Sequence, residues 1–197
     1  MIAETAKIYP NVRFGANCVV EDFCIIGCPF AGYGGEETVI GDDAVIRSHT
    51  VIYAGNKIGR NFITGNKVNL RELNEIGDGV SIGTHSVIEH HVAIGNGVRI
   101  HSLVFVPEYT VLENDCWIGP NVVFTNDRYP QSPKGKKKLD CVVIRERARI
   151  GANVTLLPGV EVGSGTLVGA GSVVTENLAG GSIFAGCPAR FIREIHY

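Results

Sequence analysis

An aliphatic residue recurs at every sixth position through most of this 197-residue chain. A period this short is typical of a solenoid, in which each repeat packs only on its neighbours. The alternation is too tight for a helix of 3.6 residues per turn, and it favours a short strand followed by a tight turn. The longest uninterrupted series has one polar exception and consists of Ile40, Ile46, Ile52, Ile58, Thr64, Leu70, Ile76, Ile82, Ile88, Ile94, Ile100, Val106, Leu112, Ile118 and Phe124.

The composition of each hexad indicates how the repeats stack. Gly often follows the aliphatic residue, and the fifth residue is usually small or β-branched. If three six-residue steps complete one coil, residues 18 apart lie one above another, and neighbouring backbones pair at about 4.8 Å. Stacked coils bury the apolar faces that no single short strand could bury alone. We expect about eight coils, which form a prism about 40 Å long.

The repeat is interrupted twice and ends before the C-terminus. We expect residues 1–178 to form the β-helix, with loops at about 29–38 and 127–143, and residues 179–197 to form a cap with a short helix or an extended tail. Long loops on a rigid scaffold often carry function. Four lysines in the second loop favour either a role in steering a polyphosphate ligand or a solvated loop tip: Lys134, Lys136, Lys137 and Lys138.

Charge and cysteine usage narrow the class of protein. The net charge is −2, which gives no bias toward nucleic acid or a membrane surface. No apolar run resembles a secretory signal or approaches 18 residues, so we expect a cytoplasmic protein. Cys18, Cys24 and Cys116 fall on the small interior position and are interpreted as core thiols.

The 18-residue spacing places titratable side chains in one outward-facing column. Glu72, His90, Glu108 and Asn126 all occupy the third hexad position. A carboxylate one coil away from an imidazole can fix which ring nitrogen carries the proton, as a general base requires. The alternative interpretation is that these four residues are ordinary polar side chains on the surface, without a catalytic role. The flanking columns bring further candidates for substrate contacts to the same edge: Arg71, His91, Tyr109 and Asp127. His101 lies in a separate column with Gly65, Gly83 and Gly119, and is a further candidate for substrate contact.

The hexapeptide pattern resembles the left-handed parallel β-helix of the hexapeptide-repeat acyltransferases. The segment IEHHVAIGNGVRIHS is similar to sialic-acid and bacillosamine-type sugar acetyltransferases, whose general-base histidine matches His90. The segment WIGPNVVFTNDRYPQSP is similar to nucleotide-sugar N-acetyltransferases that modify a 3-amino sugar, several of which have Asn at the position of His90. The segment VGAGSVVTENLAGGSIFAGCPARFIREI resembles the coenzyme A end of the superfamily.

This resemblance implies an acetyl-CoA-dependent N-acetyltransferase that acts on a nucleotide-linked amino sugar in surface-polysaccharide biosynthesis. It implies a homotrimer with the site between neighbouring prisms, and no requirement for a metal. His90 is the expected base, held by Glu108 or Glu72, and Gly119 or Gly151 is expected to offer a backbone N–H to the oxyanion. The residues expected to contact coenzyme A are Gly119, Gly151, Ala152, Ala170, Gly171 and Arg190.

Other functions fit parts of the same pattern. The spacing from His85 to His90 resembles the H-x-x-x-x-H of γ-class carbonic anhydrases, which bind a metal between subunits. That site needs a third histidine near residues 67–72, and none is present. His49 lies two coils from His85, which is about 9.6 Å and too far for a shared metal. A non-catalytic scaffold, and O-acetylation or transfer of another acyl group on the same fold, are the remaining alternatives.

Overall fold

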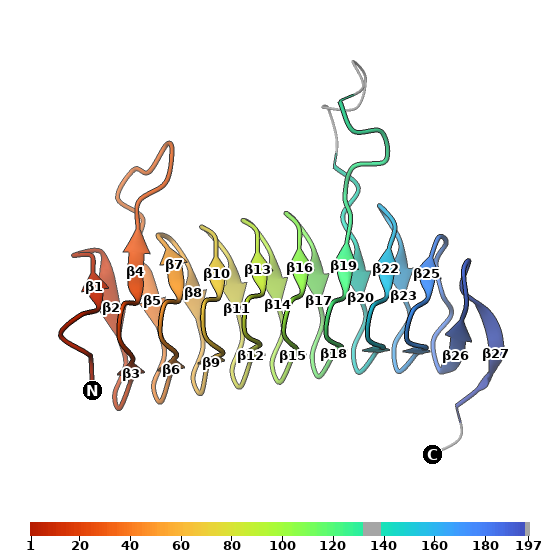
Figure 1. Ribbon diagram of the computed structural model, residues 1–197, viewed down its shortest axis with the longest axis horizontal. Coiled ribbons are helices and arrows are strands. Elements are labelled where there is room, and N and C mark those ends of the chain that lie inside the picture. The colour runs from red at the N-terminus through yellow and green to blue at the C-terminus, as the bar shows by residue number, and fades with distance from the viewer. Residues whose placement is uncertain (132–138, 196–197) are drawn as a thin grey trace.

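The computed structural model describes residues 1–131 and 139–195, which form strands, turns and loops without a helix. Except at the C-terminal end, the strands stack as parallel neighbours in three sheets that form the faces of a prism, a left-handed parallel β-helix (Figure 1). The expected fold class is therefore confirmed. The four lysines of the second loop, Lys134, Lys136, Lys137 and Lys138, lie outside the described residues.

Each turn of the chain contributes one strand to each sheet. The first sheet contains β1 (Lys7–Ile8), β4 (Ile25–Cys28), β7 (Val51–Tyr53), β10 (Asn69–Leu70), β13 (Val87–Ile88), β16 (Phe105–Val106), β19 (Val123–Phe124), β22 (Thr155–Leu156) and β25 (Val173–Val174). The second contains β2 (Val12–Phe14), β5 (Thr38–Ile40), β8 (Lys57–Ile58), β11 (Glu75–Ile76), β14 (Ala93–Ile94), β17 (Val111–Leu112), β20 (Val143–Ile144) and β23 (Glu161–Val162). The third contains β3 (Val19–Val20), β6 (Val45–Ile46), β9 (Ile63–Thr64), β12 (Ser81–Ile82), β15 (Arg99–Ile100), β18 (Trp117–Ile118), β21 (Arg149–Ile150), β24 (Leu167–Val168), β26 (Ser182–Ala185) and β27 (Arg190–Glu194).

The register of the sheets confirms that residues 18 apart are vertical neighbours. Leu70 pairs with Ile52 on one side and with Ile88 on the other. Across the two loops the spacing is longer, since Ile26 pairs with Ile52 and Phe124 pairs with Leu156. Both loops rise from the edge between the first and second sheets, which lies uppermost in Figure 1 and is called the 1–2 edge below. The other two edges are called the 2–3 edge and the 3–1 edge.

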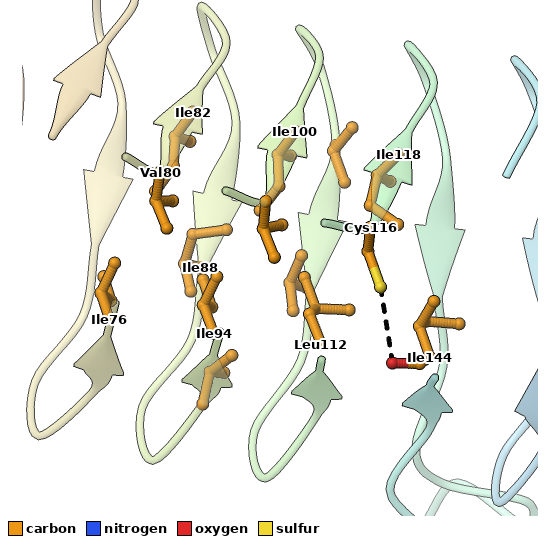
Figure 2. Packing of buried hydrophobic residues seen from close by; sticks show 14 of the residues in the cluster. Ile76, Val80, Ile82, Ile88, Ile94, Ile100, Leu112, Cys116, Ile118 and Ile144 are labelled. Carbon is orange, nitrogen blue, oxygen red and sulfur yellow. Dashed lines mark hydrogen bonds between the residues drawn. The ribbon is translucent and has the colours of Figure 1, made fainter. Parts of the chain in front are cut away.

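The interior of the prism is filled by the aliphatic residues of the hexads, which stack in columns (Figure 2). Ile88 is completely buried, and burial of such a side chain stabilises the fold by about 1.5–3 kcal/mol. Cys116 occupies a small interior position, and burial raises the pKa of its thiol to about 12. The Thr64 hydroxyl, the polar exception in the series, is buried and accepts a hydrogen bond from Arg47 N at 2.9 Å.

Glycine and left-handed residues allow the corners of the prism to turn. A Cβ added at Gly59 would lie 2.7 Å from the backbone carbon of Gly77, so a side chain there would force adjacent coils apart. Each edge also contains residues with φ near +60°. Asn and Gly adopt this region most easily, yet Leu73, His91 and Tyr109 occupy it at the 1–2 edge.

Of the two forms expected for the C-terminal cap, a short helix or an extended tail, the structure has the extended one. β26 continues the third sheet beyond β24, and β27 returns antiparallel to β26. Figure 1 shows this hairpin closing the C-terminal end of the prism.

Candidate active site

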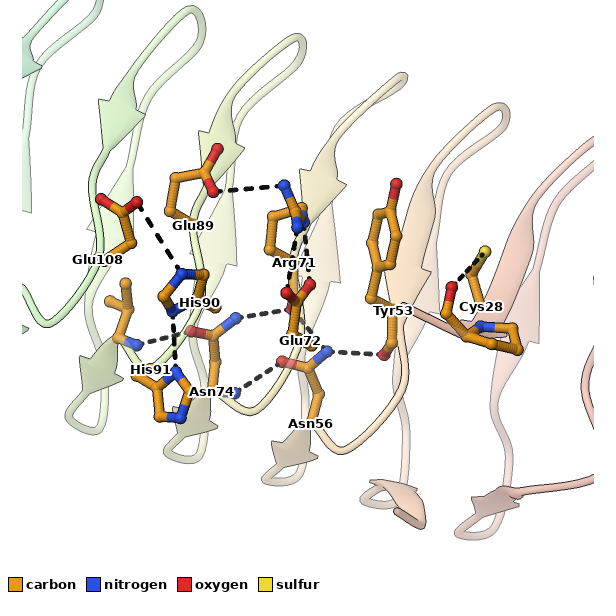
Figure 3. Close-up of polar contacts among 12 residues, drawn as sticks. Cys28, Tyr53, Asn56, Arg71, Glu72, Asn74, Glu89, His90, His91 and Glu108 are labelled. Carbon is orange, nitrogen blue, oxygen red and sulfur yellow. Dashed lines mark hydrogen bonds and ion pairs between the residues drawn. The ribbon is translucent and has the colours of Figure 1, made fainter. Parts of the chain in front are cut away.

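The 1–2 edge brings the predicted polar column together in successive coils. His91 N donates to Glu72 O at 3.3 Å, and Tyr109 N donates to His90 O at 3.4 Å, which fixes the backbone alignment. The side chains of His90 and Glu108 are 27% and 28% exposed, and His90 Nε2 lies 3.9 Å from Glu108 Oε1 (Figure 3). This separation is longer than a hydrogen bond, and it leaves both atoms able to contact a third group.

Asn126 at the start of the second loop holds Glu108 in place. Its Nδ2 donates to Glu108 Oε2 at 2.6 Å, so one carboxylate oxygen is occupied and Oε1 faces His90. Asp127, the next residue, accepts a hydrogen bond from Tyr129 N at 2.9 Å and shapes the beginning of the loop. The column thus extends from the coils into the loop.

Two aromatic rings surround His90. The Nδ1 atoms of His90 and His91 lie 2.8 Å apart, and this hydrogen bond was not foreseen from the sequence. The Tyr109 ring packs against both imidazoles, with centroid distances of 5.7 Å to His90 and 5.4 Å to His91. The predicted substrate residues His91 and Tyr109 therefore lie beside the predicted base.

Glu72 faces Arg71 and forms no hydrogen bond with His90 within the described residues. Arg71 donates to both carboxylate oxygens of Glu72, at 2.9 and 3.0 Å, and its Nη1 lies 3.5 Å from Glu89 Oε2. Its guanidinium also covers the Tyr53 ring. Burial by itself would raise the pKa of Glu72, but the hydrogen bonds from Arg71 and the backbone outweigh it and hold that pKa below its ordinary value.

A ladder of buried amides supports this corner from inside the prism. Asn74 Nδ2 donates to Arg71 O at 2.8 Å, and Asn74 Oδ1 accepts from Val92 N at 2.7 Å. Asn56, one coil earlier, donates to Arg71 O and accepts from Asn74 N. A polar residue at an interior hexad position, repeated 18 residues later, is the sequence signal that could have revealed this ladder.

The residues expected to contact coenzyme A lie on the 3–1 edge or near it, whereas His90 lies on the 1–2 edge. All but Arg190, which begins β27, follow β18, β21 or β24, and the whole width of the first sheet separates these turns from the 1–2 edge. The N–H groups of Gly119 and Gly151 donate to Ile150 O and Val168 O, both at 2.8 Å. Neither N–H is therefore available to an oxyanion in this arrangement, which corrects that expectation. Both glycines are explained by coil packing, since a Cβ on either would meet the next backbone within 2.8 Å.

The face of the third sheet beside this edge is hollowed. A depression of about 450 Å³ is lined by Trp117, Gly151, Leu167 and neighbouring residues. The ring of His101 packs with its centroid 4.7 Å from that of Trp117, and its buried Nε2 has no hydrogen-bond partner among residues 1–131 and 139–195. Burial lowers the pKa of His101 and so favours the neutral form of its ring.

Two further residues of the 3–1 region have defined surroundings. Gly171 has a φ of 70°, which suits the turn in which it lies. Arg190, at the start of β27, forms an ion pair with Glu176.

Comparison with known proteins identifies the family. The model of the bacterial transferase hexapeptide (six repeats) matches residues 75–108 and 141–176. WbbJ of Escherichia coli, whose name assigns it to O-acetyl transfer in lipopolysaccharide biosynthesis, is 32% identical over 153 residues, which cover 71% of each chain. The chain belongs to the hexapeptide-repeat acyltransferases.

Other hexapeptide-repeat proteins extend the comparison. The bifunctional protein GlmU of Koribacter versatilis is 24% identical over 98% of this chain, which spans only 37% of that longer protein. A solved structure from Bacillus cereus, described as an acetyltransferase and the product of the BC4754 gene, has a TM-score of 0.59 at 24% identity. It covers 72% of this chain and 78% of its own, and supports the fold assignment.

Within residues 1–131 and 139–195, no group of three or more His, Cys, Asp or Glu side chains is arranged to hold a metal. In the same residues, no helix is long and apolar enough to span a membrane.

Proposed function

We propose that this chain transfers the acetyl group of acetyl-CoA to the amino group of a nucleotide-linked amino sugar, with His90 as general base. The observation that carries the proposal is the pair of acceptor atoms His90 Nε2 and Glu108 Oε1, which lie 3.9 Å apart. A single substrate atom can approach both, because each hydrogen bond needs only about 2.7–3.2 Å.

An amine satisfies this pair of acceptors better than a hydroxyl. A neutral primary amine has two N–H groups and one lone pair, so it can donate to both acceptors while the lone pair points at the thioester. A hydroxyl has one hydrogen and leaves one acceptor unpaired, which costs about 1–3 kcal/mol once the site is closed to water. The bond from Asn126 fixes Glu108 in the orientation that this contact requires.

The chemistry then needs little beyond proximity and a place for one proton. Acetyl-CoA supplies the acyl group as a thioester, whose thiolate is a good leaving group. The amine nitrogen bonds to the carbonyl carbon, the carbon–sulfur bond breaks, and the amine proton moves to His90 Nε2. His90 returns that proton to the departing sulfur or to solvent. Holding the two substrates together accounts for much of the rate.

The separation of the 1–2 edge, which carries His90, from the 3–1 edge, which carries the residues expected to contact coenzyme A, favours an active site shared between subunits. We place the reaction in a cyclic homotrimer, where His90 of one subunit faces the 3–1 edge of the next. The backbone N–H groups of Ala152 and Ala170 donate no hydrogen bond within the described residues. They are therefore suited to bind the amide oxygens of the pantetheine arm, while Gly171 keeps the turn beside them open.

Transfer to a sugar hydroxyl is the second candidate function. It is favoured by the similarity to WbbJ of Escherichia coli, whose name specifies O-acetyl transfer. That name also supports a role in surface-polysaccharide biosynthesis for this chain.

A substrate panel tests the proposal and separates the two candidates. Uridine- and thymidine-linked sugars that carry an amine, and matched sugars with a hydroxyl at the same carbon, are incubated with acetyl-CoA, and thiol release and product mass are measured. We expect turnover with an amino sugar, and a loss in His90→Ala of about 10²-fold or more in kcat/KM. Turnover with hydroxyl sugars alone would favour O-acetylation, and near-normal turnover by His90→Ala would assign the base to another group.

A further inference from the structure

The hydrogen bond between His90 and His91 couples the protonation of the two rings. The two Nδ1 atoms are 2.8 Å apart, so one of them must carry the hydrogen and the other must accept it (Figure 3). A neutral imidazole carries its proton on only one nitrogen. If His90 donates from Nδ1, its Nε2 presents a lone pair toward Glu108. If His91 donates, Nε2 of His90 carries the proton and cannot act as a base.

The other groups that face His90 do not fix its orientation. Glu108 Oε1 lies 3.9 Å from Nε2, beyond hydrogen-bond distance, and Glu72 is bonded to Arg71. Tyr109 offers the face and edge of its ring. Glu89, the residue before His90, lies 3.5 Å from the Arg71 guanidinium. His91 is therefore the hydrogen-bond partner of the His90 side chain within the described residues.

We propose that His91 is a positioning residue that accepts the Nδ1–H of His90 and so directs the Nε2 lone pair toward the acceptor amine. This inference rests on the proposed function, because it assigns His91 a role in the proton transfer that His90 performs. His91 then carries its own proton on Nε2, away from the shared bond.

Each proton has a defined place when His90 donates its Nδ1–H to His91. When His90 Nε2 takes the amine proton, Nδ1–H still donates to His91, and the new Nε2–H faces the carboxylate of Glu108. A second proton on His91 Nδ1 would set two N–H groups against each other across 2.8 Å. As long as this bond persists, the pair therefore has a place for one additional proton, on His90 Nε2.

The backbone permits variants that separate positioning from folding. His91 has a φ of 56°, in the left-handed region that Gly and Asn adopt easily. His91→Gly thus removes the hydrogen bond without backbone strain, and His91→Asn keeps a short side chain that can accept it. His85 has a φ of 60° on the 3–1 edge, so His85→Gly is a matched control for the backbone change.

The decisive measurement is the tautomer of His90. Long-range ¹H–¹⁵N spectra of histidine-labelled protein, assigned by comparison with His90→Asn, report which ring nitrogen is protonated. We expect Nδ1 in the wild type and in His85→Gly, and a shift toward Nε2–H in His91→Gly. A proton on His90 Nε2 in the wild type, or unchanged His90 signals in His91→Gly, would overturn the proposal. This readout needs no substrate, so it stands apart from success or failure of the substrate panel.

The second test of the proposal measures the kinetics of the variants with the substrate that the panel identifies. A positioned base contributes about 10²- to 10⁴-fold, so we expect His91→Gly to lose at least about tenfold in kcat/KM and His91→Asn to recover most of it. His91→Asp should move the acid limb of the pH profile to higher pH, because a carboxylate favours the protonated ring. Equal kcat/KM values and one common pH profile in all three variants would show that His91 only fills space.

Discussion

Glu108 is the residue on which the choice between an amine and a hydroxyl acceptor depends. Glu108→Gln replaces one acceptor with an amide that can turn an N–H toward His90 Nε2 and occupy its lone pair. A hydrogen bond to a charged group is worth about 1.5–3 kcal/mol, so we expect kcat/KM for the amino sugar to fall about 10- to 100-fold. The measurement is thiol release at saturating acetyl-CoA.

The matched control for that substitution is Glu75→Gln, an exposed carboxylate that pairs with Lys57 on the second sheet. It should leave kcat/KM unchanged. An equal loss in both variants, or none in Glu108→Gln, would contradict the assignment of the second acceptor.

The sequence placed His90, Glu108 and Asn126 in one column because that inference needs only the coil period. It did not foresee how the side chains turn within the column. Glu72 has the same register as Glu108, yet the adjacent Arg71 engages its carboxylate. The pairing of His90 with His91 depends on the left-handed backbone at residue 91, which spacing alone does not report.

At the scale of one coil, the buried amide ladder determines the stability of the corner that carries the site. Asn74→Ala would leave Val92 N–H buried without a partner and would remove one of the two side-chain donors to Arg71 O. An unsatisfied buried donor costs about 1–3 kcal/mol, and with the lost packing we expect about 2–4 kcal/mol from urea unfolding.

Asn66→Ala is the control for the ladder, because Asn66 Nδ2 bonds Ser48 at an exposed position. We expect this variant to cost no more than about 1 kcal/mol, the typical net worth of a hydrogen bond. Similar losses in the two variants would mean that the ladder does not support the corner.

The contact of Arg71 with Glu72 makes the same corner sensitive to pH. The folded-state pKa of Glu72 lies below the unfolded value, so its stabilising contribution is present above the unfolded pKa and is lost as pH falls through the folded pKa. We expect Glu72→Gln to melt below the wild type at pH 7, and the gap in Tm to narrow below about pH 4, the ordinary range of a carboxyl. A gap that stays constant with pH would show that the charge of Glu72 contributes nothing to stability.

At the scale of the whole molecule, the sequence predicted the fold because one short period repeats in nearly every coil. Ile52, Leu70 and Ile88 stack as the spacing requires, and each break in the period became a loop. The cap was less predictable, since a segment that leaves the repeat carries no register. The arrangement of neighbouring prisms is not encoded in the period at all, because it depends on the outward faces.

The shared active site can be tested by complementation. His90→Ala removes the proposed base on the 1–2 edge, and Ala170→Trp fills the proposed coenzyme A path on the 3–1 edge, where Ala170 is exposed. Each variant alone should be inactive. When the two variants are unfolded together and refolded, one kind of interface pairs an intact His90 with an intact Ala170, so random cyclic trimers should recover about a quarter of wild-type activity.

As the control, the two variants are refolded separately and then mixed. Activity should appear in that mixture only if the assembled trimers exchange subunits. No recovery in co-refolded trimers of confirmed mass would place both residues in the site of a single subunit, which the width of the first sheet between the two edges argues against.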